Sequence, residues 1–372
     1  MVGSVHLFEP LMVRGVRLEN RIVVAPMSQY SAVDGVPQEW HLQHYGALVA
    51  SGPGMVVIEA TAVAPEGRIT PGCLGLYSDD CETGMAHLVS SIKRFGSAKI
   101  ALQIGHAGRK ASTQRPWQGG GPLASAEGAW PTLSASAVPF AANWPRPREM
   151  GAYDLDRLRD AFAASAVRAA RAGLDAIEVH AAHGYLLHQF LSPLSNRRSD
   201  AYGGPIEGRM RFPLEVIRAV RRAWPVNKAL GVRISATDWV DGGFSTDDAI
   251  VFVAACKAEA VDYVCVSSGG LVPDAKIPLT PGYQVDLAAR VRRETGILTR
   301  AVGLIADPNQ AETVLARGQA DFIALGRAFL DDPRWVWHAA EALRVTPSYP
   351  PQYLRAQPKL WPGAKERVNP DR

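Results

Sequence analysis

Short apolar runs alternate with longer amphipathic segments along most of the chain. The runs are rich in β-branched residues and almost continuously hydrophobic, as parallel strands covered on both faces are. Eight such runs occur, at residues 21–27, 55–63, 99–106, 176–183, 230–235, 263–270, 298–303 and 322–329. The pattern therefore predicts eight buried parallel strands.

Helical spacing of apolar residues fills the intervals, at residues 39–50, 80–95, 155–172, 207–223, 246–259, 284–294 and 309–317. Several of these segments follow capping residues: Asp154, Ser245 with Asp248 three positions later, and Asp307 before a proline. An eightfold alternation of strand and helix predicts an α/β fold, a single closed (β/α)8 or TIM barrel, over residues 1–345.

Three segments do not fit the alternation. The opening "LFEPLMVRGVRLENR" is interpreted as a hairpin that plugs the bottom of the barrel. Residues 112–150, rich in Pro, Gly and Ser, follow the third strand and are expected to form a lid or cap over the barrel mouth. The Pro-rich tail at 346–372 is expected to contact a neighbouring subunit.

Composition narrows the class of protein. Of 372 residues 47% are hydrophobic and 20% charged, as in ordinary globular proteins. The 40 basic and 36 acidic residues are dispersed, so nucleic acid is not expected as a partner. The four cysteines form no C-x-x-C pair, which indicates no disulfide framework or cysteine metal site and fits a reducing cytoplasm. Neither a signal peptide nor a membrane span is indicated, so we expect a cytoplasmic protein.

The stretch "HAAHGY" carries His180, His183 and Tyr185 at the end of the fourth predicted strand, where barrels place their active sites. A metal site is one interpretation, and it needs a third ligand. The nearest acidic residues for that role are Glu59, Glu178 and Asp238. Satisfied, non-catalytic histidines are a second interpretation.

A pair of hydrogen-bond donors is the third interpretation. Neutral imidazoles can donate to an oxygen that gains negative charge, and a phenol such as Tyr185 can supply a proton to a developing carbanion. Acid-assisted reduction of this kind needs a hydride source. Because no side chain is one, a redox cofactor is expected at the barrel mouth.

Glycines and an arginine after the last two strands favour a phosphate site. Gly303 follows the seventh strand, and Gly326 with Arg327 follows the eighth, where barrels commonly bind phosphate. No GxGxxG opens a helix after a strand, so a mononucleotide such as FMN is preferred to a dinucleotide. Gln103 and Arg233 are expected to face the mouth.

Arg233 could stabilise negative charge on a reduced flavin, because its guanidinium keeps its charge at any relevant pH. The alternative is a structural ion pair of Arg233 with Asp238 or Glu178.

Together these residues resemble the old yellow enzyme family of FMN-dependent ene-reductases over essentially the whole chain. The motifs are "LFEPLMVRGVRLENRIVVAPMSQYSA", "EATAV", "LQIGHAGRK", "EVHAAHGYLLHQFLSPLSNRRSDAYGG", "RISATDW", "AVGLI" and "ALGRAFLDDP". The "QYLRA" tail is similar to the thermophilic-like subclass, in which a C-terminal arginine reaches the partner's site.

The resemblance implies a set of site residues. His180 and His183 would bind the carbonyl or nitro oxygen of an activated alkene, and Tyr185 would donate the proton. Tyr30 and a neighbour's Arg355 would also contact substrate. FMN would be bound by Ala25, Pro26, Met27, Ser28, Ala60, Gln103, Arg233, Gly303, Gly326 and Arg327, and no metal is expected.

One residue departs from the subclass, which usually has cysteine where this chain has Ser28. A hydroxyl is less polarisable and far less acidic than a thiol. The resemblance therefore does not predict the reduction potential of the flavin or the substrate preference.

The expected activity is reduction of FMN by NADPH or NADH, followed by hydride transfer to the β-carbon of an enone, enal, maleimide or nitroalkene and protonation of its α-carbon. The expected assembly is a homodimer or homotetramer. The alternatives are a desaturase or biosynthetic redox enzyme of the same fold, a non-catalytic flavin-binding protein, and a metal-dependent lyase or hydrolase. Relatives with an iron–sulfur cluster are excluded by the absence of clustered cysteines.

Overall fold

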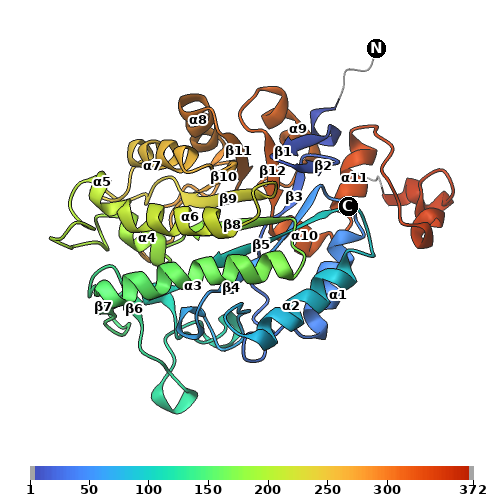
Figure 1. Ribbon diagram of the computed structural model, residues 1–372. Coiled ribbons are helices and arrows are strands. Elements are labelled where there is room, and N and C mark those ends of the chain that lie inside the picture. Colours follow the sequence, from blue (N-terminus) through green and yellow to red (C-terminus); the bar gives the residue numbers. More distant parts are fainter. Residues whose placement is uncertain (1–4, 368–372) are drawn as a thin grey trace.

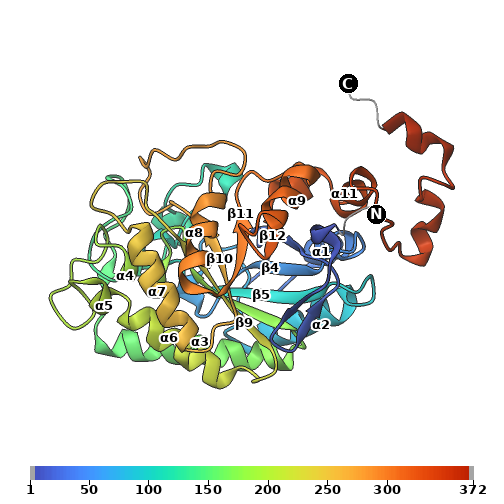
Figure 2. The ribbon, with the colours of Figure 1, turned by 90° about the horizontal axis from the view of Figure 1, so that it is seen from above.

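Eight parallel strands close into a barrel that is ringed by helices (Figures 1 and 2), which confirms the predicted fold class. The computed structural model describes residues 5–367, so residues 1–4 and 368–372 of the predicted domain and tail lie outside the described part. The barrel strands are β3 (Ile22–Val24), β4 (Met55–Ala62), β5 (Lys99–Gly105), β8 (Ala176–Ala181), β9 (Ala229–Ser235), β10 (Tyr263–Ser267), β11 (Leu298–Val302) and β12 (Phe322–Leu325).

The outer ring of helices packs its apolar faces on the barrel. It comprises α1 (Glu39–Val49), α2 (Asp79–Ile92), α3 (Ala152–Arg171), α6 (Arg211–Ala223), α7 (Thr246–Ala258), α8 (Val285–Thr295), α9 (Pro308–Ala316) and α11 (Trp335–Ala342). In α2, for example, Met85, Leu88 and Ile92 recur at helical spacing and are almost fully buried. This spacing is what made the helices predictable.

Helix boundaries show where the prediction was wrong. Asp154 is not an N-cap: α3 begins three residues earlier after Gly151, and the Asp154 carboxylate accepts from the Gly151 N–H at 2.9 Å. The predicted helix at 207–223 is two helices, α5 (Ile206–Arg209) and α6, separated at Met210. The capping box of Ser245 and Asp248 and the N-cap at Asp307 are confirmed.

Short elements complete the inventory. They are α4 (Leu186–Leu191), α10 (Arg327–Asp331), β6 (Leu133–Ser134), β7 (Arg148–Glu149), η1 (His6–Phe8), η2 (Pro65–Gly67), η3 (Gly108–Lys110), η4 (Pro116–Gln118), η5 (Ser125–Glu127), η6 (Pro351–Ala356) and η7 (Pro362–Arg367). The sequence did not predict α4 or α10, because both are too short to show a period.

The predicted N-terminal hairpin is present and closes one end of the barrel. Strands β1 (Leu11–Val13) and β2 (Val16–Leu18) pair in antiparallel register. Val13 and Leu18 are fully buried and cluster with Val23 and Met55 from the barrel interior. In Figure 1 the hairpin lies at the top, on the side away from the teal cap segment at the bottom.

The cap segment 112–150 is joined to the barrel by hydrogen bonds. Arg109 donates to the carbonyls of Val138 and Pro139, each at 3.2 Å, and to that of Leu271 at 2.8 Å. The Trp117 ring meets the Tyr30 ring edge-on with centroids 5.9 Å apart. The segment therefore lies beside the C-terminal ends of the strands.

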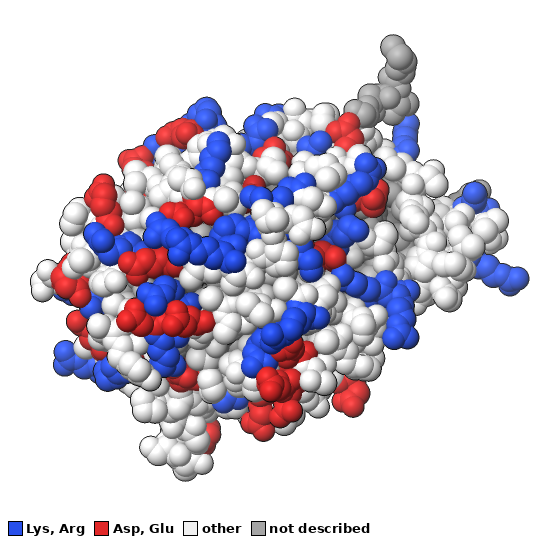
Figure 3. Space-filling view, in the orientation of Figure 1, with Lys and Arg blue, Asp and Glu red and all other residues white. Residues whose placement is uncertain are grey.

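The tail projects away from the barrel in Figures 1 and 2. Its first part is attached by Arg334, whose guanidinium lies 4.6 Å from the Trp337 ring and 4.5 Å from the Tyr353 ring. On the face drawn in Figure 3, Lys and Arg lie beside Asp and Glu in several clusters, which are separated by uncharged areas. Within residues 5–367, no helix combines the length and apolar character needed to cross a bilayer.

Candidate active site at the barrel mouth

The strand register brings the polar residues of the mouth together. His180 on β8 lies opposite Arg233 on β9, and Gln103 on β5 lies opposite Glu178 on β8. Parallel strands in register end at the same side of the barrel, so side chains 53 residues apart in sequence become neighbours. Ala60, at the end of β4, is half-buried and opens to the same mouth.

His183 is held in an unusual backbone conformation. Its φ is +57°, in the left-handed region that a non-glycine residue enters only when its surroundings stabilise it. Its N–H donates to Ser235 Oγ at 2.9 Å, and its carbonyl accepts from Lys110 Nζ at 2.8 Å. This turn is what lets two histidines three residues apart converge.

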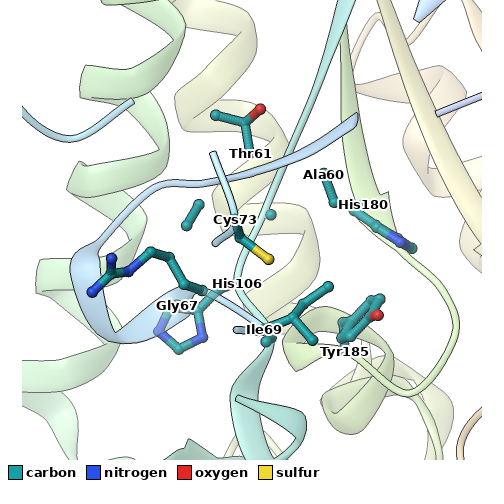
Figure 4. Close-up of a pocket in the computed structure, with 12 residues that line it drawn as sticks. Ala60, Thr61, Gly67, Ile69, Cys73, His106, His180 and Tyr185 are labelled. Atoms are coloured by element: carbon teal, nitrogen blue, oxygen red, sulfur yellow. The ribbon is translucent and has the colours of Figure 1, made fainter. Parts of the chain in front are cut away.

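The two imidazoles and the phenol form a compact group. The His180 ring centroid lies 5.2 Å from that of His183 and 4.9 Å from that of Tyr185, and both pairs of rings are nearly perpendicular. Tyr185 is the N-cap residue of α4, whose first N–H donates to the His106 carbonyl. In Figure 4, His180 and Tyr185 lie on the same side of the pocket, with Ile69 next to Tyr185.

Burial keeps both histidines neutral. It lowers the pKa of His180 and of His183 well below the ordinary value, and the nearby charge of Arg233 lowers both pKa values further. Burial likewise raises the pKa of Tyr185, so the phenol keeps its proton at neutral pH. The site thus offers two neutral imidazoles and one protonated phenol.

Among residues 5–367 no acidic side chain forms an ion pair with Arg233, so the predicted alternative of a structural ion pair with Asp238 or Glu178 is wrong. Glu178 pairs with Arg300 inside the barrel and accepts from Gln103 Nε2 at 2.8 Å. Asp238 lies 3.0 Å from His188 and accepts from Ser192. Arg233 is only 8% exposed, and its Nε has no hydrogen-bond partner among the described residues.

An unpaired buried guanidinium at the mouth suits a flavin. A buried charge without a partner is costly, and the pyrimidine end of a reduced flavin offers a negative acceptor. Gln103 adds to this fit, because its bond to Glu178 directs the amide nitrogen to the carboxylate and leaves the carbonyl oxygen to accept from the ligand.

The segment 25–30 forms another wall of the mouth. The Ala25 N–H donates to the Leu325 carbonyl, which joins the end of β3 to β12. Pro26, Met27 and Ser28 are half-buried, as is Tyr30, whose φ is +52°. Burial raises the pKa of Tyr30, and a hydrogen bond from Ser28 opposes that shift.

The three residues predicted to bind phosphate differ in backbone conformation and in exposure. Gly303 has φ +120°, and a Cβ there would lie 2.4 Å from Gln284 Nε2, so a side chain cannot be accommodated. Gly326 is half-buried and precedes α10. Arg327 is exposed at the first residue of α10.

Among the described residues, no third ligand for a metal lies with His180 and His183. Within residues 5–367, no three His, Cys, Asp or Glu side chains come together as a metal would require. Glu59, one of the acidic residues considered for the third ligand, does not face the barrel interior. It points to α1, where it accepts from Tyr45 at 3.1 Å and lies 3.5 Å from His41.

Other polar residues of the mouth were missed by sequence reasoning. They are Lys110, Ser235 and Gln284, which contact the HAAH turn or the Ser267 hydroxyl bonded to it. Lys110 follows β5 and Ser235 ends β9, which is the signal that could have found them, whereas Gln284 is the N-cap residue of α8 and carries no such signal. Arg355 lies in η6 of the tail and is exposed.

Comparison with known proteins agrees with this geometry. Residues 6–345 match the NADH:flavin oxidoreductase / NADH oxidase family. The chain is 45% identical over 351 residues to an NADPH dehydrogenase of Geobacillus thermodenitrificans, covering 94% of this chain and 98% of that protein.

Solved structures agree as well. Morphinone reductase in complex with tetrahydroNAD is 25% identical with a TM-score of 0.76, over 92% of this chain and 93% of that one. 2-Naphthoyl-CoA reductase, at 23% identity and a TM-score of 0.82 over 91% of this chain and 52% of that one, shares the fold. The chain belongs to the NADH:flavin oxidoreductase / NADH oxidase family, the old yellow enzymes, and is an FMN-dependent oxidoreductase that takes its electrons from NAD(P)H.

Proposed function

We propose that the protein is an ene-reductase that reduces activated alkenes such as enones, enals, maleimides and nitroalkenes. The observation that carries the proposal is the group of two neutral imidazoles and one protonated phenol at the mouth, beside the unpaired Arg233. Donors aimed at one point stabilise an oxygen that becomes negative during reaction.

The hydride for the β-carbon of the alkene would come from FMN bound at the mouth and reduced beforehand by NAD(P)H. His180 and His183 donate hydrogen bonds to the carbonyl or nitro oxygen of the substrate and so polarise the double bond. Tyr185 donates its proton to the α-carbon. The residues proposed to hold FMN are Ala25, Pro26, Met27, Ser28, Ala60, Gln103, Arg233, Gly303, Gly326 and Arg327.

Substrate selection is proposed to involve Tyr30 and a second chain. Tyr30 borders the mouth and contacts the Trp117 ring of the cap. Arg355 is exposed on a tail that leaves its own barrel, so we propose that it acts in the site of a neighbouring subunit of a homodimer or homotetramer. Alkene and nicotinamide would use one site in turn, which predicts ping-pong kinetics.

Ser28 bears on a second candidate within the family. A hydroxyl is less polarisable than a thiol, so flavin potential and preferred direction can differ from relatives with cysteine there. In a desaturase or biosynthetic redox enzyme, NAD(P)H would bleach the flavin slowly, and oxidation of the substrate would be favoured over its reduction.

Anaerobic titration tests the proposal. The purified holoenzyme is titrated with NADPH and, separately, with NADH while the flavin absorbance is followed. An enone, a maleimide or a nitroalkene is then added. The proposal predicts bleaching by a nicotinamide and recovery of colour with formation of the saturated product.

Two results would contradict the proposal. A flavin that a nicotinamide bleaches but that no alkene of the panel reoxidises would exclude ene-reduction. A flavin that neither nicotinamide bleaches would favour a binding protein, the non-catalytic alternative.

A further inference from the structure

His183 and Ser267 form the shortest side-chain contact at the HAAH turn. His183 Nε2 lies 2.7 Å from Ser267 Oγ, at the end of β10. Either atom could supply the proton of this hydrogen bond. Its direction decides which ring nitrogen of His183 carries the proton, since a neutral imidazole has one donor and one acceptor.

The surroundings of Ser267 favour donation from the hydroxyl. Gln284 Nε2 donates to the Val302 carbonyl at 2.7 Å, so its Oε1 is an acceptor. Ser268 Oγ donates to that oxygen at 2.7 Å, whereas the competing hydrogen bond from Ser267 Oγ to the same oxygen is longer, at 3.3 Å. The proton of Ser267 therefore has its nearer acceptor in His183 Nε2.

The other histidine has the opposite arrangement. His180 Nδ1 accepts from the Ala182 N–H at 3.3 Å, so its proton is on Nε2. Among the described residues, neither His180 Nε2 nor His183 Nδ1 has a hydrogen-bond partner, and neither is a fully buried atom. These two nitrogens are the ones left for a ligand at the mouth.

We propose that Ser267 is a positioning residue that keeps the proton of His183 on Nδ1, so that His183 and His180 both direct an N–H at the substrate oxygen. This inference rests on the proposed function. If Ser267 accepted instead, Nδ1 would present a lone pair to that oxygen, and the two would repel each other.

Nitrogen-15 NMR of the holoenzyme labelled in histidine tests the assignment directly, because long-range proton–nitrogen correlations distinguish a protonated ring nitrogen from a bare one. The His183 signals are identified by their loss in His183→Ala. We expect Nδ1 protonated in the wild type and in Ser267→Thr, which keeps the hydroxyl. In Ser267→Ala the proton should move at least partly to Nε2.

Ser235→Ala is the matched control. It also removes a serine hydroxyl bonded to His183, but at the backbone N–H rather than at the ring. We expect its His183 ring to remain protonated on Nδ1. If Ser267 had only a structural role, the ring proton would not move in Ser267→Ala while staying on Nδ1 in Ser235→Ala.

Kinetics give a second readout. In Ser267→Ala the rate of alkene reduction should fall about tenfold or more, up to the roughly 10²- to 10³-fold loss seen when an oxyanion donor is removed. Ser267→Thr should recover most of this rate, and the affinity for FMN should stay unchanged in both variants.

The outcomes separate the two proposals. Protonation of His183 on Nε2 in the wild type, or an unchanged Nδ1 proton in Ser267→Ala, overturns the role of Ser267. The expected tautomers in an enzyme that reduces none of the alkenes would leave that role intact and reject ene-reduction.

Discussion

At the scale of single residues, the mouth places two neutral imidazoles beside the buried guanidinium of Arg233, which has no ion-pair partner among residues 5–367. His180 and His183 are neutral because burial and Arg233 both lower their pKa values. A neutral imidazole stabilises a developing oxyanion without first attracting an anionic ligand, while Arg233 remains available for the flavin. We therefore propose that the two histidines bind the substrate and that Arg233 binds the cofactor.

The double variant His180→Ala/His183→Ala should abolish alkene reduction and retain FMN. Each oxyanion donor typically contributes about 10²–10³-fold to the rate, so a loss of at least ~10³-fold is expected. Steady-state turnover of an enone and the visible spectrum of the purified protein give the two readouts. His87→Ala, on the exposed face of α2, is the control.

The donor role would be wrong if the double variant turned over an enone near the wild-type rate. Loss of FMN together with activity would instead assign the histidines to cofactor binding.

At the scale of elements, one buried carboxyl joins a strand, a helix and the segment 25–30, which is proposed to contact FMN. Glu59 on β4 accepts from Tyr45 on α1, and its Oε2 accepts from the Gln29 N–H at 2.8 Å. Burial raises its pKa from 4.5 to about 8. The loop that carries Ser28 and Tyr30 therefore depends on a carboxyl that is mostly protonated at neutral pH.

This pKa predicts how stability changes with pH. Because the folded state holds the Glu59 proton up to about pH 8 and the unfolded chain loses it near 4.5, the contribution of Glu59 to stability is full below 4.5 and is lost as pH rises to about 8. Glu59→Gln stays neutral, so the wild-type melting temperature should fall relative to the variant across this range.

Thermal unfolding of the holoenzyme at several pH values measures the difference. Glu39→Gln, on the exposed start of α1, should keep the wild-type dependence. An equal pH dependence in wild type and Glu59→Gln would show that Glu59 titrates near its ordinary value.

At the scale of the whole molecule, the tail carries exposed apolar and charged side chains that its own barrel does not cover. Beyond the contacts of Arg334 with Trp337 and Tyr353, residues 351–355 are exposed, including Arg355. Leu354 and Leu360 are 44% and 57% exposed, which is unusual for leucines on a short folded segment. A second chain covering this surface would account for both features.

Hybrid dimers test whether Arg355 acts across an interface. A subunit with Arg355→Ala and an intact histidine pair is co-expressed with a His180→Ala/His183→Ala subunit under different affinity tags. If Arg355 completes the partner's site, each purified hybrid regains one working site, about half the wild-type turnover per dimer. The Arg355→Ala homodimer should be less active than the hybrid when turnover is counted per site that keeps both histidines.

Equal turnover per intact site in the hybrid and in the Arg355→Ala homodimer would show that Arg355 does not act across the interface. Sedimentation of the wild type reports the assembly state independently.

Much of this protein could be predicted from its sequence. Hydrophobic periodicity and turn residues are local properties, so they indicated the eight strands, most helices, the hairpin and the caps at Ser245 and Asp307. The order of strands then predicted which residues would reach the mouth, and the family follows from the motifs found there.

Only the tertiary structure decided which side chains pair. Glu178 could have met Arg233 on the adjacent strand but pairs with Arg300, 122 residues away, and Glu59 turns outward to α1. The left-handed turn at His183 and its bond to Ser267 also join separate strands. Such pairings depend on how a closed barrel staggers its strands and on which buried charge finds a partner, and no local pattern in a sequence encodes either.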